Sequence, residues 1–216
     1  MVTYGPRQTV IRQGEHSHYV LLMLSGHLKV VVETEFGGAV VMSLCGRGEL
    51  LGETSVLDGL PRFANVVTCT AVRARLIKNV QLREFLDRNP DAWAALAGAM
   101  SARLRWANDR RAEFVTCPAP VRVGRVLAEI VQRHGERTAA GWDLDVALTQ
   151  AELASLAGVA LATFEKALQA MQRSGLVLRR YRRIVVADLA GLRRFSGLSA
   201  SAIGQGAVNS RSYARG

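Results

Sequence analysis

The residues whose types and spacing best suit chemistry lie in one short segment, Gly52 to Ala64. A Gly-Glu pair opens the segment, and a Gly-x-Pro-Arg turn containing Arg62 closes it. Small residues permit a tight turn whose backbone N–H groups face an anion, with the Arg62 guanidinium as a fixed cation. Glu53 would repel a phosphate, and its carboxylate is better suited to accept a hydrogen bond from a ribose hydroxyl. The segment therefore indicates a nucleotide site. A surface ion pair between Glu53 and Arg62 in a simple turn remains the alternative.

Metal binding and enzymatic catalysis receive little support from the other reactive side chains. Cys45, Cys69 and Cys117 lie far apart and form no C-x-x-C pair, so we expect free thiols in a reducing compartment and no metal site. His16 and His18 fall in a predicted turn, and we expect them at the surface. We find no nucleophile–base pair, metal-ligand set or paired carboxylates at useful spacing, and we expect that the protein is not an enzyme.

Charge is unevenly distributed along the chain of 216 residues, whose net charge is +10. Residues 1–115 carry 14 Lys and Arg against 11 Asp and Glu, whereas residues 116–216 carry 14 against 7. A basic C-terminal half indicates a polyanionic partner, most simply nucleic acid. A generally arginine-rich composition is the alternative. The sequence has neither a long apolar run nor a signal-like N-terminus, so we expect a cytoplasmic protein.

Short β-strands are predicted between residues 7 and 80, because apolar runs alternate with glycine turns. The predicted runs cover residues 10–11, 19–24, 28–32, 39–42, 65–69 and 71–77. Gly37 and Gly38 mark a hairpin turn. Many short strands of this kind are typical of a small barrel or jelly roll.

A long helix is predicted to follow, with Asn89 as its cap and Pro90 at its first position. Its apolar residues recur at alternating spacings of four and three, as on the contact face of paired helices. This stripe comprises Trp93, Ala97, Met100, Leu104, Ala107, Arg111 and Phe114, and Arg111 breaks its apolar character. The stripe favours a dimer seam, and a helix lying on its own β-domain is the alternative. Two prolines at 118 and 120 end the helix in a stiff elbow.

Residues 148–195 carry a second informative pattern, after a predicted helix at 121–134 and a predicted short strand at 142–146. Thr149-Gln150-Ala151-Glu152 is a capping box that opens a helix, and Gly158 breaks that helix. A second helix runs from about residue 160 to Arg173. Two apolar runs then flank the sequence Arg179-Arg180-Tyr181-Arg182-Arg183. This order predicts a winged helix-turn-helix, with an ordinary helical hairpin as the alternative.

In combination, these motifs resemble the bacterial cyclic AMP receptor protein family, the Crp/Fnr superfamily, over about residues 5–194. The family's pattern G-E-x-x-x-L-x-x-x-x-x-R-x-A is matched by Gly52, Glu53, Leu57, Arg62 and Ala64. Asn89-Pro90-Asp91 matches the start of the family's dimerisation helix, and Gly124-Arg125 fits the helix after its hinge. The chain starts almost at the first strand, so we do not expect the family's short N-terminal helical segment in it.

The resemblance implies an α+β fold in four parts. A cyclic-nucleotide-binding-like β jelly-roll at 1–88 precedes a long dimerisation helix at 89–116, a C-terminal winged helix-turn-helix DNA-binding domain at 117–196 and a disordered tail at 197–216.

The resemblance also implies roles for the residues of the first segment. Glu53 would hold a ribose 2′-hydroxyl, and Arg62 would pair with a cyclic phosphate. The expected ligand-binding set is Gly52, Glu53, Thr54, Arg62, Phe63, Ala64 and Asn108. Two family hydroxyls are missing, because Phe63 and Ala107 replace them, and the loss of two hydrogen bonds costs about one to two decades of affinity. Cyclic AMP is the leading effector, and cyclic GMP, another nucleotide or no effector are the alternatives.

The helix expected to read DNA departs further from the family. Its Arg-Glu pair and following Arg are replaced by Leu161, Ala162 and Lys166, so we expect a different operator. Thr163 matches a phosphate contact of the family. The expected DNA-binding set is Gln150, Leu161, Ala162, Thr163, Lys166, Arg179, Arg180, Arg182 and Arg183. The affinity should rest largely on phosphate contacts.

The sequence therefore predicts a homodimeric transcription regulator of the Crp/Fnr type that a nucleotide gates. Its expected partners are double-stranded DNA, a second copy of the chain through residues 93–114, and RNA polymerase, with no membrane and no metal. One alternative is a regulator of the same fold that needs no ligand because Phe63 fills the pocket. Another is a nucleotide-binding module that acts on a protein partner and carries a degenerate helix-turn-helix.

Overall fold

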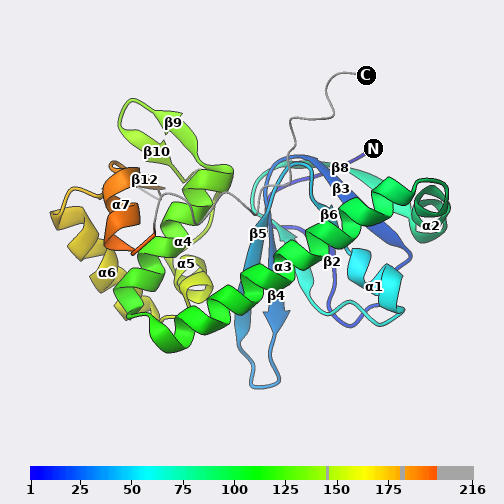
Figure 1. The fold of residues 1–216 in the computed structure, drawn as a ribbon, viewed down its shortest axis with the longest axis horizontal. Coiled ribbons are helices and arrows are strands. Elements are labelled where there is room, and N and C mark those ends of the chain that lie inside the picture. The colour runs from blue at the N-terminus through cyan, green and yellow to red at the C-terminus, as the bar shows by residue number, and fades with distance from the viewer. Residues whose placement is uncertain (145, 181–182, 199–216) are drawn as a thin grey trace.

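Two four-stranded sheets form the N-terminal part of the chain (Figure 1). The computed structural model describes residues 1–144, 146–180 and 183–198. The sheets have the strand orders β1-β8-β3-β6 and β2-β7-β4-β5, with antiparallel pairing. The strands are β1 (Val2–Tyr4), β2 (Thr9–Ile11), β3 (Tyr19–Ser25), β4 (Leu28–Glu33), β5 (Ala39–Cys45), β6 (Leu50–Leu51), β7 (Asn65–Thr68) and β8 (Val72–Lys78).

Alternating apolar side chains place one face of each sheet in a shared core. Leu21 and Met23 of β3 are fully buried there, together with Leu28 of β4 and Val72 of β8. Successive side chains on a strand point to opposite faces, so Val20, which directly precedes Leu21, points to the other side and packs with the helices. The predicted jelly roll is confirmed as a sandwich of two sheets.

Four elements of this part were not predicted: β1, β6 and two helices. The strand β6 is only two residues long, which is too short to show an alternating pattern. The helix α1 (Glu53–Asp58) lies inside the segment expected to be a tight turn, and α2 (Asn79–Arg88) directly follows β8. Leu82 and Leu86 of α2, one helical turn apart, pack with Val20 in a second buried cluster.

The longest helix, α3 (Pro90–Thr116), starts where the sequence predicted, with Pro90 in its first turn. Asn89 occupies the cap position, but the expected side-chain cap is wrong. The Nδ2 atom of Asn89 donates to the carbonyl of Phe85 in α2 at 2.7 Å, so the side chain closes the preceding helix. The helix ends just before Pro118, as predicted.

The predicted stripe of α3 lies mostly outside the core of its own chain. Leu96, which is not part of the stripe, is buried, and Met100 packs beside the same cluster. Trp93 is 39 % exposed, Leu104 64 % and Phe114 48 %. The alternative that this face lies on the chain's own β-domain therefore fails for most of the stripe.

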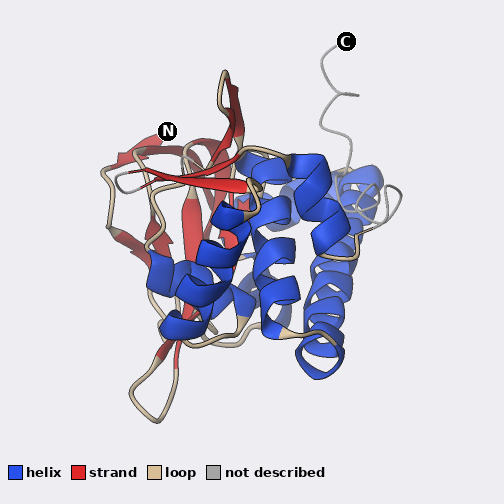
Figure 2. Ribbon diagram, turned by 90° about the vertical axis from the view of Figure 1, so that its left-hand side faces the viewer, coloured by secondary structure: helices blue, strands red, loops and turns tan. Residues whose placement is uncertain are grey.

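The C-terminal part begins with α4 (Ala119–His134), which returns alongside α3. Two helices, α5 (Gln150–Ala157) and α6 (Leu161–Arg173), follow and are packed against α4. Figure 2, viewed from the side of this domain, shows its helices in front of the β-strands. The remaining elements are β9 (Glu136–Thr138), β10 (Gly141–Asp143), β11 (Val177–Arg180), β12 (Arg183–Val186) and α7 (Leu189–Phe195), and the four strands form a sheet in the order β11-β12-β10-β9.

The ends of α5 follow the sequence prediction. The Oγ1 atom of Thr149 accepts from the Glu152 backbone N–H at 3.2 Å, and the Glu152 carboxylate accepts from the Thr149 N–H at 2.8 Å. This reciprocal pair is the predicted capping box. Gly158 has φ 59° and ends the helix, and a Cβ atom at this position would collide with the ring of Phe114. Backbone conformation and close packing therefore both require glycine in this turn.

Two other expectations are met only in part. The strand predicted at 142–146 is found as β10 but is shorter, and Asp145 lies outside the described residues. The predicted helix at 121–134 begins two residues earlier, as α4. The helix α7 was not predicted. From residue 199 onward, the segment expected to be a disordered tail lies outside the described residues.

The helix α5 docks on the β-sandwich of the same chain. The backbone N–H of Val41 in β5 donates to Ser155 Oγ of α5 at 2.9 Å. Lys29 of β4 forms an ion pair with Glu152 of α5. Leu44 of β5 belongs to the buried cluster that fills the C-terminal domain. The two domains therefore share a continuous core with polar contacts at its edge.

Two histidines meet at this domain contact. The rings of His27 and His134 pack edge to face, with their centroids 5.2 Å apart. Burial, reinforced by His27 and Arg133, lowers the pKa of His134 from 6.5 to about 4. Arg133 itself pairs with Glu49 of the sandwich at 3.5 Å. Protonation of His134 is therefore unfavourable while the domains are docked.

The cysteines and two of the histidines differ in their burial, and the two histidines lie at the surface as expected. Cys45 and Cys69 are buried, Cys117 is partly buried, and His16 and His18 are exposed. Within residues 1–144, 146–180 and 183–198, no three His, Cys, Asp or Glu side chains are grouped to hold a metal ion. No helix in that same part of the chain has the length and apolar character needed to cross a membrane.

Acidification should weaken the docking of the C-terminal domain. His134 must be neutral when docked but protonates below its ordinary pKa of 6.5 when released, so docking is strongest above that pH and weakens as the pH falls. Between about pH 7.5 and about pH 5.5 the docking constant should fall by up to about tenfold. Hydrogen exchange at the Val41 amide, corrected for intrinsic rates, measures this change. His134→Gln should remove most of the pH response and the surface change His16→Gln should keep it, so an unaltered response in His134→Gln would contradict the assignment.

Candidate functional site

The segment from Gly52 to Ala64 begins with a left-handed glycine and continues into α1. Gly52 has φ 85°, and its carbonyl accepts a hydrogen bond from Nη1 of Arg62. A Cβ atom on Gly52 would lie only 2.6 Å from that nitrogen. The position therefore requires glycine for its backbone angle and for the close approach of Arg62. The expected tight turn is wrong for residues 53–58, because they form the helix α1.

Glu53 is the first residue of α1, and only 3 % of its surface is exposed. Its Oε1 atom forms an ion pair with Nη1 of Arg103 in α3. Arg103 also donates from Nη2 to the Leu50 carbonyl at 2.8 Å. A buried carboxylate needs such a partner, because removing a lone charge from water is costly. The ion pair therefore attaches α3 to the sandwich.

Arg62 is equally buried, and every nitrogen of its guanidinium has a protein acceptor. Its Nε donates to Ser17 Oγ at 2.7 Å, its Nη1 to the Gly52 carbonyl and its Nη2 to the Tyr19 carbonyl. Burial lowers the pKa of Arg62, and the neighbouring Tyr19 and Glu53 oppose that shift. The alternative of a surface ion pair between Glu53 and Arg62 is wrong, because both side chains are buried and each has other partners.

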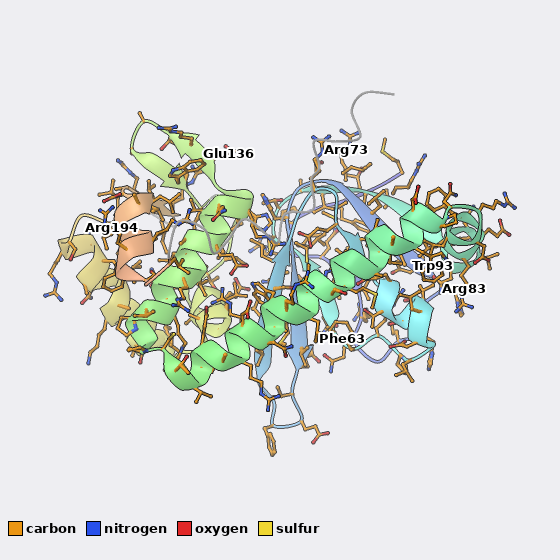
Figure 3. The ribbon with its side chains drawn as sticks, in the orientation of Figure 1. Phe63, Arg73, Arg83, Trp93, Glu136 and Arg194 are labelled. Carbon is orange, nitrogen blue, oxygen red and sulfur yellow. The ribbon has the colours of Figure 1, made fainter. Side chains whose placement is uncertain are left out.

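The remaining predicted ligand residues are less closely gathered. Phe63 is 60 % exposed, so it does not fill an internal pocket (Figure 3). Ala64 is buried, and Thr54 is partly buried. Asn108 lies exposed on α3, and its side chain makes no hydrogen bond with the described residues. Within one chain, the structure thus brings Glu53 and Arg62 together at Gly52 and does not join Asn108 to them.

Sequence analysis missed the residues that complete these contacts. Arg103 lies one helical turn before Ala107, the position where the family has a ligand-binding hydroxyl, so their shared helix face was an available signal. Ser17 supplies a hydroxyl from a loop that showed no motif. Tyr19 contributes its backbone carbonyl, which every residue type has, so the sequence gives no signal for this contact.

The helix α6 directs its apolar side inward and its polar side outward. Phe164, Leu168 and Met171 are completely buried, whereas Leu161 is 44 % exposed. The predicted DNA-contact residues on this helix are Leu161, Ala162 and Lys166, which are exposed, and Thr163, which is partly buried. This face offers two small apolar groups for a thymine methyl and one cation for guanine or phosphate.

A groove separates the basic hairpin from the start of α5. Its lining includes Gln150 and Leu153 of α5, Arg179 and Arg180 of β11, and Arg183 of β12. Arg179 and Arg180 are exposed beside this groove, as suits contacts with a phosphate backbone. Arg183 is exposed as well but already engaged, since its Nη1 donates to Asp143 Oδ2 at 3.0 Å. Arg182 lies outside the described residues.

Comparison with protein-family models assigns both parts of the chain. Residues 1–89 match the cyclic nucleotide-binding domain, and residues 121–195 match the Crp-like helix-turn-helix domain. The CRP-like cAMP-activated global transcriptional regulator of Mycobacterium tuberculosis is 27 % identical over 193 residues, which cover 89 % of this chain and 86 % of that protein. The similar curated proteins are transcription regulators and not enzymes.

Solved structures show the same architecture. FixK2 from Bradyrhizobium japonicum has a TM-score of 0.78 at 18 % identity, covering 92 % of this chain and 98 % of that one. The c-di-GMP responsive global regulator CLP from Xanthomonas campestris has a TM-score of 0.73 at 21 % identity, covering 87 % and 93 %. A cyclic nucleotide-binding sandwich, a long helix and a winged helix-turn-helix follow one another in this order, and the chain belongs to the Crp/Fnr superfamily of bacterial transcription regulators.

Proposed function

We propose that the protein is a homodimeric DNA-binding transcription regulator whose β-sandwich binds a small nucleotide, with cyclic AMP as the leading effector. The observation that carries this proposal is the burial of two opposite charges, Glu53 and Arg62, at Gly52 and beside α3. A turn with a purely structural role has no need of two charges whose desolvation is costly. The relative from Mycobacterium tuberculosis is described as cAMP-activated, which supports the same class of effector.

In this proposal Glu53 accepts the ribose 2′-hydroxyl and Arg62 pairs with the cyclic phosphate. The other proposed ligand residues are Gly52, Thr54, Phe63, Ala64 and Asn108. Arg62 must exchange part of its protein acceptors for the phosphate, so binding and a local rearrangement of this segment occur together. The regulator CLP is described as c-di-GMP responsive, so a cyclic dinucleotide belongs among the effectors to be tested.

The occupied guanidinium of Arg62 also favours a second candidate function. Each of its three nitrogens has a protein acceptor without any phosphate, which suits a regulator of the same fold that needs no ligand. In this version, Arg62 is a structural residue that ties the sensor segment to β3. Because Phe63 is exposed, its ring does not fill the pocket, but this does not exclude a regulator that needs no ligand.

The proposed organisation keeps the boundaries 1–88, 89–116 and 117–196 for sensor, dimerisation helix and DNA-binding domain. The proposed DNA contacts are Gln150, Leu161, Ala162, Thr163, Lys166, Arg179, Arg180, Arg182 and Arg183. Two copies joined through residues 93–114 would present two α6 helices to half-sites about one helical turn apart. Such a dimer would act in the cytoplasm and contact RNA polymerase at its promoters.

Calorimetry with cyclic AMP, cyclic GMP and cyclic di-GMP should separate the two candidate functions. We expect heat and a thermal shift with at least one of them. Glu53→Gln should weaken that binding by about tenfold or more, since a hydrogen bond to a charged group contributes about 1.5–3 kcal/mol. Glu84→Gln, an exposed carboxylate of α2, serves as the matched control. No heat and no thermal shift at millimolar concentrations of all three ligands would leave the ligand-independent regulator as the function.

Disruption of the α3 stripe should produce monomers. Leu104→Glu places a charge in the centre of the proposed seam, where its desolvation opposes association. Ala95→Glu introduces the same charge at an exposed position outside the stripe and should leave the dimer intact. Sedimentation equilibrium measures the monomer–dimer equilibrium of both variants. A dimer that survives Leu104→Glu unchanged, or an unmodified chain that is monomeric, would place the interface elsewhere or remove it.

A salt series of DNA binding should reveal a sequence-specific reader. Arg179→Ala and Arg180→Ala should each weaken binding to all sequences and reduce the slope of log K against log salt by about one unit. Lys166→Ala should change the preferred sequence instead. Arg88→Ala, on α2 of the sandwich, is the charge-matched control. Binding that shows no preference for any selected sequence over random DNA would favour a module that acts on a protein partner.

A further inference from the structure

A chain of ion pairs runs from the sensor site to the C-terminal domain. Beyond the Glu53–Arg103 pair, Arg103 approaches Glu49 at 3.7 Å, and Glu49 approaches Arg133 of α4 at 3.5 Å. Arg133 continues to Glu129 in the same helix at 3.4 Å. From Glu129 the pairs extend along the α3–α4 contact through Arg110, Glu113 and Arg125. Oppositely charged side chains thus connect the buried carboxylate of the sensor with the helix that carries the DNA-binding domain.

Glu49 is the point where this chain crosses from one domain to the other. It lies in the turn between β5 and β6, and its backbone carbonyl accepts from the Met23 N–H of β3 at 2.9 Å. One carboxylate oxygen, Oε2, faces Arg103 of α3, and the other, Oε1, faces Arg133 of α4. Oε1 also accepts from the Gly46 N–H at 3.3 Å. The main chain therefore holds this carboxylate between two guanidinium groups that belong to different domains.

We propose that Glu49 couples the Glu53 site to the docking of the DNA-binding domain by sharing its carboxylate between Arg103 and Arg133. Because Arg103 has two carboxylate partners, a change at Glu53 alters how strongly Arg103 is drawn to Glu49. The attraction that Glu49 exerts on Arg133 changes in the opposite sense, and with it the docking of α4 and α5. Coupling of this kind is reciprocal, so docking also biases the state of Glu53.

The burial of the two carboxylates gives the relay its direction. The side chain of Glu53 is 4 % exposed and that of Glu49 is 24 % exposed, so the interaction of Arg103 with Glu53 is less screened by water. When Glu53 is neutralised, or when it accepts a ligand hydroxyl, Arg103 turns toward Glu49. The attraction between Glu49 and Arg133 then becomes weaker. The bistable element that receives the signal is the docked contact of α5 with β5.

The same domain contact contains an ion pair that lies outside this relay. Lys29 pairs with Glu152 across the contact, and neither of them pairs with Arg103 or Glu49 among the described residues. Loss of the Lys29 pair should weaken docking without interrupting the connection to Glu53. Lys29→Gln is therefore a matched control, because it removes a charge from the same contact.

A double-mutant cycle on the full chain without ligand tests the proposal. The readout is the hydrogen-exchange protection of the Val41 amide, which donates across the domain contact, with the amide of Val20 in β3 as the monitor of global unfolding. Glu53→Gln and Glu49→Gln should each lower the protection of Val41 by about two- to fivefold and leave that of Val20 unchanged. Glu53→Gln should retain its effect in a Lys29→Gln background and lose it in a Glu49→Gln background.

The outcomes of this cycle are distinct. An equal effect of Glu53→Gln with and without Glu49, or no effect of Glu53→Gln on the unmodified chain, would overturn the relay. If Glu49→Gln does not fold, Glu49→Asp repeats the cycle, because the shorter side chain keeps its charge but cannot span both arginines. The step in which a bound ligand shifts Arg103 toward Glu49 rests on the proposed function. Absence of nucleotide binding would remove the effector but not the relay, since the cycle is run without ligand.

Discussion

The ion pair between Glu53 and Arg103 is the contact on which the arrangement of the domains depends. Glu53 begins a short helix inside the β-sandwich and is almost completely buried, so its charge must be compensated from a fixed place. The long helix α3 supplies that compensation through Arg103. Because α4 packs along α3, the position of Arg103 also helps to set where the DNA-binding domain meets the sandwich. One buried carboxylate thus links the β-sandwich to the position of the C-terminal domain.

The residues proposed to contact DNA are mostly exposed in the docked arrangement. Leu161 and Lys166 of α6 and the arginines at 179 and 180 of β11 are exposed while α5 is docked on β5. Docking therefore does not cover these side chains. In the proposed two-fold dimer, the placement of the two α6 helices would determine the distance between the half-sites that can be bound at once. The polar edge of the contact, with its ion pairs and its histidine pair, makes the arrangement responsive to charge.

Arg62 shows how one residue type can satisfy two interpretations. Its identity and spacing indicate a phosphate ligand, whereas each nitrogen of its guanidinium already has an acceptor within the protein. Both descriptions agree on the requirement for glycine at position 52, because the guanidinium lies where a Cβ atom would stand. The affinity of the site for any anion depends on the free energy needed to release Arg62 from its carbonyl partners.

Much of the architecture was predictable from the residues themselves. Apolar runs between glycine turns marked six of the eight strands of the sandwich, the Thr149–Glu152 capping box and Gly158 marked the helix-turn-helix, and Pro90 and Pro118 marked the limits of α3. These signals are local, because periodicity, caps and breakers act within a few residues of the chain. Only the tertiary structure showed that Glu53 pairs with Arg103, that Arg62 is bound by backbone carbonyls, and that Glu49 stands between two domains. Such contacts join residues far apart in sequence. Every residue has a backbone carbonyl and any carboxylate can pair with two arginines, so neither contact can be predicted from a sequence pattern.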